Sequence, residues 1–389
     1  MQDVTIPGPF YPALGGELHD VTLRVECVGD ASLPRCKTIV VFPSFSHSSH
    51  VAATTDDPSP GWWSDMVRPG GPIDTRSWRV LCVSPLGSPF SLTNPSRSRG
   101  ADGKPLRLRF PTLTPSDLAR AAAGALGVLG CGVGSDAPPG ARPLRALIGA
   151  SLGGMQALQF ASIFPGAAER VCTVSTTGRT TPFTVAVRHM QRASILNDPD
   201  WRNGDYEDAG VAPSKGLALA RELGTLFYRS RSEFDSRFSW GVKGANLPGV
   251  ADPSHATPSW SRLNNWEVES YLTYAGKKFV YDANSYLLLS VAMDLHDLGD
   301  GAAGRSSFAD GAACIAAGGA TRALLVGVSQ DTLIPAQESK CLADAINAAV
   351  PGSAEYMELN SPLGHDAFLK PKEVPVLGDA IKAFIEKEV

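Results

Sequence analysis

The sequence feature that most constrains the fold is the pattern Gly-x-Ser-x-Gly, which follows directly on a short apolar run within residues 147–156. The apolar run has the length of a buried strand, and residues 156–163 have the apolar spacing of a helix. Gly149 and Gly153 leave room for a sharp strand-to-helix turn, which would expose the hydroxyl of Ser151 at a helix N-terminus. The alternative is a glycine-rich turn with a solvated serine, because five-residue matches are common by chance.

A nucleophilic serine needs two partners elsewhere in the chain, a histidine that takes its proton and a carboxylate that orients the histidine. Asp331 follows the buried-strand pattern at residues 324–329, and His365 follows a second short strand candidate at residues 356–359. Open α/β sheets place their sites beyond such strand ends. Taken singly, Asp331 could cap a strand end and His365 could be a surface loop histidine. The chain order Ser151, Asp331, His365 is that of the α/β-hydrolase fold and favours a catalytic triad.

The loop at residues 43–50 follows another predicted buried strand. In α/β hydrolases this loop supplies one backbone N–H of the oxyanion hole, and the residue after the nucleophile supplies the other. We therefore predict that the N–H groups of Phe45 and Leu152 form the oxyanion hole. For His47 and His50 in the same loop, the alternative to a functional role is a capping or solvated histidine.

The remaining pattern predicts an α/β-hydrolase core interrupted by one long helical insertion. Strands are expected at residues 21–28, 38–42, 79–83 and 170–176, the first of them at a sheet edge, and core helices at 114–129 and 375–388. Beyond residue 176 the pattern changes to helical stretches with charged faces, at 185–196, 214–228, 266–275 and 282–298. We therefore predict a mostly parallel central sheet from residues 1–176 and 320–389, with residues 177–319 inserted as a helical cap.

Composition restricts the class of partner. With 43% hydrophobic and 19% charged residues, the 389-residue chain can bury a full α/β core and a large insertion. Its net charge of −4 gives no reason to expect nucleic acid or an anionic membrane as a partner.

No apolar run approaches the roughly 18 residues that span a bilayer, and residues 1–8 have no signal-peptide pattern. Seven scattered cysteines without a Cys-x-x-Cys pair indicate reduced thiols, so we expect a cytoplasmic protein without a metal site.

Several longer motifs extend the argument beyond the triad. They lie at residues 61–63, 69–70, 73–75, 149–156, 191–192, 198–201, 204–206, 220–224, 227–230, 281–286, 292–295 and 364–366. Through these motifs the chain resembles, over nearly its whole length, the homoserine/serine O-acyltransferases, which are α/β-hydrolase acyltransferases of methionine and cysteine biosynthesis. Residues 48–50 and 62–63 are most similar to the branch that acylates serine. Residues 87–95 depart from the family pattern, which leaves the acceptor and the acyl donor open.

The resemblance also implies roles for three charged residues. Arg221 and Asp366 are implied to bind the amino acid, since a guanidinium can hold its carboxylate and a carboxylate can receive its ammonium group. Arg188 is implied to select the acyl group, because a succinyl carboxylate buried near Ser151 needs a cation and an acetyl group does not. The alternatives are an exposed helix arginine for Arg221, and a solvated or Asp-paired arginine for Arg188, for example one that contacts Asp198.

The resemblance implies transfer of an acyl group from acyl-CoA, a co-substrate, through an acyl-Ser151 intermediate to the hydroxyl of serine or homoserine. No other cofactor is expected. Acetyl and succinyl both stay open as the acyl group, with serine and succinyl preferred, and the family suggests a homodimer formed through the cap. The alternatives are an esterase with the same triad, a homoserine O-acetyltransferase, and a non-catalytic α/β-hydrolase binding protein.

Overall fold

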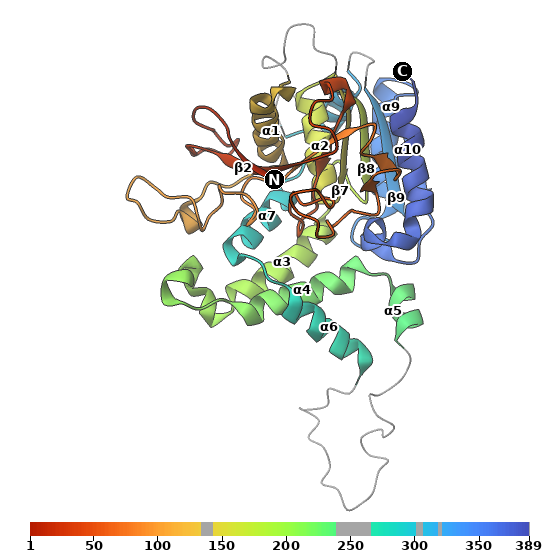
Figure 1. Cartoon of the computed structure of the whole chain (residues 1–389). Coiled ribbons are helices and arrows are strands. Elements are labelled where there is room, and N and C mark those ends of the chain that lie inside the picture. Colours follow the sequence, from red (N-terminus) through yellow and green to blue (C-terminus); the bar gives the residue numbers. More distant parts are fainter. Residues whose placement is uncertain (134–142, 239–265, 301–305, 318–320, 389) are drawn as a thin grey trace, which may run out of the picture.

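A mostly parallel sheet forms the centre of the computed structural model, which describes residues 1–133, 143–238, 266–300, 306–317 and 321–388 (Figure 1). The strands are β1 Gln2–Thr5, β2 Thr22–Val28, β3 Thr38–Phe42, β6 Arg79–Val83, β7 Leu144–Ala150, β8 Ala168–Val174, β9 Arg322–Val328 and β10 Ala354–Leu359. Their order across the sheet is β1-β2-β6-β3-β7-β8-β9-β10. Strand β2 is antiparallel to β1 and β6, and the other neighbours are parallel, which confirms the predicted fold class.

The expectation that residues 21–28 form an edge strand is wrong. Strand β1 pairs with β2 on its outer side, so β2 is an internal strand with neighbours on both sides. Strand β1 is only 4 residues long, and Val4 is its single buried residue. A segment with one buried side chain has no apolar periodicity, which is why the sequence pattern did not indicate it.

Helices cover both faces of the sheet. On one face the core includes side chains of α1 Pro115–Leu126, α2 Leu152–Ile163, α8 Phe308–Ile315 and α9 Ala336–Ala349, and on the other those of α10 Asp379–Glu386. Helix α1 begins as predicted, because Thr114 and Asp117 form a reciprocal capping box with Pro115 at the first position. The last helix begins later than the predicted residue 375, since Pro375 belongs to a separate π-helical turn, Val374–Gly378.

Between β8 and β9 the described residues add no strand to the sheet. They form α3 Pro182–Leu196, α4 Ser214–Tyr228, α5 Arg231–Arg237, α6 Glu267–Lys278, α7 Ala283–Asp294 and α8. Helix α3 packs against α4 and α7, and α4 packs against α6, as a group below the sheet in Figure 1. Helix α8 lies within the predicted insertion but packs against the core helices α2 and α9. The bounds 177–319 of a separate cap stay a prediction, and residue 319 lies outside the described residues.

Shorter elements connect these helices and strands. They are the strand pair β4 Val67–Arg68 and β5 Ile73–Asp74, the turns η1 Arg35–Lys37, η2 Arg107–Arg109, η3 Gly127–Cys131, η5 Pro199–Gly204 and η6 Glu207–Ala209, and near the C-terminus η9 Gly364–Leu369, η10 Pro371–Glu373 and η11 Val374–Gly378.

In the part of the chain that the structure describes, no helix is long and apolar enough to cross a membrane. The same residues contain no group of three His, Cys, Asp or Glu side chains arranged to hold a metal ion.

Candidate active site

The Gly-x-Ser-x-Gly pattern forms a sharp turn between β7 and α2. Ser151 is the single residue between the two elements and has φ 54° and ψ −121°, a strained conformation for a residue with a side chain. A Cβ atom on Gly149 would lie 2.2 Å from the backbone of Gly153, and a Cβ atom on Gly153 would lie 2.0 Å from the carbonyl oxygen of Phe42. Only glycine fits at both positions, so this turn is the strand-to-helix turn that the motif predicts.

The turn places the hydroxyl of Ser151 next to a buried histidine and carboxylate. Ser151 Oγ lies 3.0 Å from Nε2 of His365, and Nδ1 of His365 lies 2.7 Å from Oδ2 of Asp331. The second oxygen of Asp331 accepts hydrogen bonds from the N–H groups of Leu333 and Ile334, at 2.9 and 2.8 Å. His365 is only 3% exposed and is therefore not a surface loop histidine. The structure therefore brings together Ser151, Asp331 and His365, the three residues that the sequence suggested as a triad.

The charge of Asp331 sets the protonation behaviour of His365. Burial by itself lowers the pKa of this imidazole, but the charge and the hydrogen bond of Asp331 outweigh burial, so the pKa lies above its ordinary value. A histidine with a raised pKa takes a proton from a neighbouring hydroxyl more readily, and the carboxylate stabilises the imidazolium that forms. This arrangement can activate Ser151 as a nucleophile.

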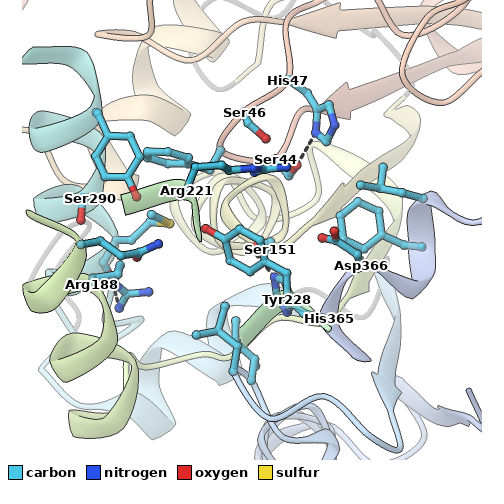
Figure 2. Close-up of a pocket in the computed structure, with 18 residues that line it drawn as sticks. Ser44, Ser46, His47, Ser151, Arg188, Arg221, Tyr228, Ser290, His365 and Asp366 are labelled. Carbon is cyan, nitrogen blue, oxygen red and sulfur yellow. Dashed lines mark hydrogen bonds between the residues drawn. The ribbon is translucent and has the colours of Figure 1, made fainter. Parts of the chain in front are cut away.

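A pocket opens above Ser151, between the strand ends and the helices that follow β8 (Figure 2). Phe45 lies in its wall, where its ring stacks on Tyr281 at 5.4 Å and its carbonyl oxygen accepts a hydrogen bond from the Tyr281 hydroxyl at 2.9 Å. Leu152 is the first residue of α2, and the first N–H groups of a helix have no partner within the helix. Phe45 therefore lines the same pocket as Ser151, and Leu152 follows Ser151 directly in the chain.

Arg221 and Asp366 line the same pocket, although they belong to α4 and η9. The guanidinium of Arg221 lies 5.6 Å from the ring centre of Tyr228 and 5.1 Å from that of Phe279. Among the described residues no carboxylate forms an ion pair with Arg221, so its charge faces the pocket without a partner. Asp366 is 3.8 Å from Arg229. The alternative of an exposed helix arginine at position 221 is wrong, because this residue is half-buried in the pocket wall.

Arg188 lies on the opposite side of Ser151 from Asp366 in Figure 2, and it is only 4% exposed. Its Nε is 2.5 Å from one carboxylate oxygen of Asp294, and Arg192 is 2.6 Å from the other oxygen. The alternative of an Asp-paired arginine is therefore confirmed, with Asp294 as the partner. Asp198, the example considered from the sequence, instead accepts hydrogen bonds from backbone N–H groups, including that of Gly216 at 2.7 Å. The guanidinium groups of Arg188 and Arg192 share the single carboxylate of Asp294. This group of three side chains therefore has a net charge of +1 at this end of the pocket.

Comparison with known proteins identifies the family. The model of the α/β-hydrolase fold family matches residues 140–371. A serine O-succinyltransferase of Litchfieldella anticariensis is 37% identical over 95% of this chain and 94% of its own length. A homoserine O-acetyltransferase of Symbiobacterium thermophilum is 38% identical over 98% of this chain and 93% of its own. The chain belongs to the homoserine/serine O-acyltransferase family.

Solved structures of two kinds of enzyme, an esterase and an acyltransferase, have the same fold as this chain. Esterase E22 is 26% identical, with a TM-score of 0.80 over 99% of both chains. A homoserine O-acetyltransferase of Bacillus anthracis has a TM-score of 0.82 over 100% of this chain and 98% of its own, at 24% identity. The fold is therefore shared by acyltransferases and esterases, and the side chains in the pocket must distinguish between these activities.

One pocket residue of this family member has an environment that the sequence did not indicate. His47 lines the pocket, where its Nδ1 is hydrogen-bonded to the hydroxyl of Ser44 and its ring stacks on Trp62 at 4.8 Å. Burial lowers the pKa of His47 to about 4, so the ring is neutral at neutral pH. Nδ1 of His50, in the same loop, lies 2.9 Å from Oε1 of Glu26. Neither histidine is simply solvated. The tryptophan pair at residues 62–63 was the sequence feature that could have predicted the packing around His47.

Proposed function

We propose that this enzyme transfers an acyl group from acyl-CoA, through an ester on Ser151, to the hydroxyl of L-serine or L-homoserine, with serine preferred. The observation that supports this function is the placement of Ser151 and His365 in a pocket that also presents Asp366 and Arg221, a cation with no ion-pair partner among the described residues. Acyl-CoA is a co-substrate, and no further cofactor is needed. The product belongs to cysteine or methionine biosynthesis in the cytoplasm.

The first half-reaction forms the acyl-enzyme. Nε2 of His365 takes the proton of Ser151 while the serine oxygen bonds to the thioester carbonyl carbon. The N–H groups of Phe45 and Leu152 stabilise the negative charge on the carbonyl oxygen. The carbon–sulfur bond then breaks, and His365 returns the proton to the sulfur of CoA.

The second half-reaction repeats the same steps with the amino acid as the attacking group. His365 takes the proton of the acceptor hydroxyl, the acceptor oxygen bonds to the acyl carbon, and Ser151 leaves with the proton. Arg221 and Asp366 would hold the carboxylate and the ammonium group of the acceptor, so that its hydroxyl faces the ester. Orientation of a bound acceptor in a largely buried pocket favours transfer over attack by water.

Arg188 supports succinyl as the acyl group. The cluster of Arg188, Arg192 and Asp294 carries one surplus positive charge, and Arg188 is the member that lines the pocket. The free carboxylate of a succinyl group would be desolvated beside Ser151, and a buried charge is costly unless it is paired. An acetyl group has no charge to pair there. The neighbouring family members carry both donor names, so the charge of the pocket is the feature that favours succinyl.

Exposed apolar side chains on the helices above the pocket support a homodimer. Helix α3 exposes Met190 and Leu196, and α4 exposes Leu219 and Leu226, at 46 to 56% exposure. Met190 and Leu219 line one surface hollow between the two packed helices, and apolar side chains exposed to water are typical of a protein contact surface. We propose that two copies of the chain cover this surface in the dimer.

A four-way assay tests the function. Acetyl-CoA or succinyl-CoA is combined with L-serine or L-homoserine, with a control that lacks the amino acid, and release of the CoA thiol is followed. We expect the fastest release with succinyl-CoA and L-serine, and at least a tenfold slower steady rate without an acceptor, since an oriented hydroxyl reacts faster than water. An equal rate with and without the amino acid would identify an esterase instead.

Replacement of Arg221 or Asp366 by alanine should damage the second half-reaction selectively. We expect kcat/KM for the amino acid to fall about tenfold to a hundredfold, because each variant removes one charge-assisted contact with the acceptor. The initial burst of CoA release should stay within about twofold of wild type, since the thioester reacts before the acceptor binds. Equal damage to the burst would contradict a role in acceptor binding.

A further inference from the structure

A tyrosine from the segment between β8 and β9 contacts the loop that follows β3. Tyr281 lies two residues before α7, and its hydroxyl donates a hydrogen bond to the carbonyl oxygen of Phe45 at 2.9 Å. The two rings also stack, with their centres 5.4 Å apart and an angle of 14° between their planes. These contacts join residues 236 positions apart. The proposed mechanism uses the N–H of Phe45, so whatever holds Phe45 in place affects the reaction.

Phe45 lines the pocket with Ser151, and among the described residues no group accepts a hydrogen bond from its N–H. The peptide group that carries this N–H is held at its other end, where the carbonyl oxygen of Ser44 accepts a hydrogen bond from the N–H of His47 at 3.1 Å. The hydroxyl of Tyr281 holds the carbonyl oxygen of the next peptide group. Both peptide groups of Phe45 are therefore restrained before the reaction, as the stabilisation of an oxyanion requires.

Aromatic side chains fix the rings of Tyr281 and Phe45 from further directions. The ring of Tyr286 meets both of them edge to face, with its centre 4.8 Å from that of Phe45 and 6.1 Å from that of Tyr281. The ring of Phe90 also meets Tyr281 edge to face, at 5.9 Å. Phe90 belongs to residues 87–95, the segment that departs from the family pattern. This departure therefore supplies part of the packing around Tyr281.

The chain on either side of Tyr281 is also held. Phe279, two residues before it, stacks on its ring at 5.4 Å. Asp282, the next residue, accepts hydrogen bonds from the N–H of Ser285 at 2.6 Å and from the hydroxyl of Ser96 at 2.7 Å. Burial raises the pKa of Tyr281 well above its ordinary value, so the hydroxyl keeps its proton and remains a hydrogen-bond donor at neutral pH.

We propose that Tyr281 is a positioning residue of the oxyanion hole, which holds Phe45 so that its N–H points at the carbonyl oxygen of the acyl group. This inference rests on the proposed function and extends its catalytic machinery to the segment between β8 and β9. In the described part of the chain the pocket is lined by Phe45 but not by Tyr281, so Tyr281 acts through Phe45. The same acyl oxygen carries the negative charge in both half-reactions, so both depend on Tyr281.

Tyr281→Phe tests this role, because it removes the hydroxyl and keeps the ring. Two single-turnover rates are measured, one for acyl-enzyme formation from acyl-CoA and one for acyl transfer to L-serine. We expect both rates to fall about tenfold, while KM for each substrate changes less than about twofold. The loss is smaller than the roughly 10²- to 10³-fold effect of deleting an oxyanion donor, because the N–H of Phe45 remains and only its restraint is removed.

Tyr274→Phe is the matched control. It removes the hydroxyl of a tyrosine of α6 that is 61% exposed, and it should leave both rates unchanged. Thermal unfolding shows whether the variants are folded, and we expect both to unfold within about 4 °C of wild type, since each loses at most one hydrogen bond. A lower unfolding temperature of Tyr281→Phe with unchanged rates would show that Tyr281 supports only the fold.

Two other results would overturn the proposal. A loss of Tyr281→Phe that appears only in KM would show that Tyr281 acts on substrate binding, and a loss in only one half-reaction would show that it does not act on the shared oxyanion. Hydrolysis of p-nitrophenyl acetate separates this inference from the proposed function, because an esterase needs the same oxyanion hole without an amino acid. Slower hydrolysis by Tyr281→Phe, with thioester turnover that ignores the amino acid, would contradict the proposed function and leave the positioning role intact.

Discussion

Replacing Ser151 by alanine should lower turnover about 10⁴-fold or more and abolish the covalent acyl-enzyme. The hydroxyl of Ser151 is the group that His365 contacts at 3.0 Å, and alanine has no oxygen to bond to the acyl carbon. Intact-protein mass spectrometry after addition of acyl-CoA without an acceptor measures the adduct directly. Wild-type enzyme should gain the mass of one acyl group, and Ser151→Ala should gain none.

The other members of the triad provide graded comparisons. His365→Ala should lose nearly as much activity as Ser151→Ala, while Asp331→Asn should lose less, because it weakens the orientation of the base and keeps the nucleophile. Ser46→Ala is the matched control, since Ser46 lines the same pocket while the hydrogen-bond partners of His365 are Ser151 and Asp331. This variant should still form the adduct. A covalent acyl adduct on Ser151→Ala would mean that another residue is the nucleophile.

Replacing Arg188 by leucine should reduce succinyl transfer about a hundredfold, a loss of roughly 3 kcal/mol of transition-state stabilisation. Leucine removes the cation that would pair with the succinyl carboxylate. Asp294 keeps its contact with Arg192 at 2.6 Å, so the substitution does not leave a buried carboxylate without a partner. Acetyl transfer should change only about threefold or less, because an acetyl group has no charge. The measurement is kcat/KM for CoA release from each thioester.

Arg192→Leu is the control for this comparison. It also removes one of the two guanidinium groups from Asp294, but Arg192 does not line the pocket. If Arg188 pairs with the acyl group directly, Arg192→Leu should affect the two thioesters alike. Equal losses of succinyl and acetyl transfer in Arg188→Leu, or a wild-type enzyme that does not use succinyl-CoA, would favour acetyl as the donor.

The sequence was sufficient for features that depend on neighbouring residues. Gly149 and Gly153 specify the turn at Ser151 because no side chain fits on either side of it. The capping box at Thr114 marks the start of α1, because its two hydrogen bonds join residues only three positions apart. Continuous apolar runs indicated the internal strands of the sheet, since these strands are buried on both faces. Strand β1 was not predicted because Val4 is its single buried residue, so its sequence has no apolar pattern.

Tertiary structure alone decided which charges are paired and which face the pocket. The packing of α3 on α7 gave Arg188 the partner Asp294, 106 positions away, in place of the nearer Asp198. The ring of His47 stacks on Trp62 in the pocket wall, and the contact of Gly364 with the end of α4 brought Arg229 next to Asp366. Local patterns specify backbone turns, strands and helix starts, because these depend on sterics and hydrogen bonds over a few residues. The charge of a site depends on side chains from distant segments, and only their packing determines it.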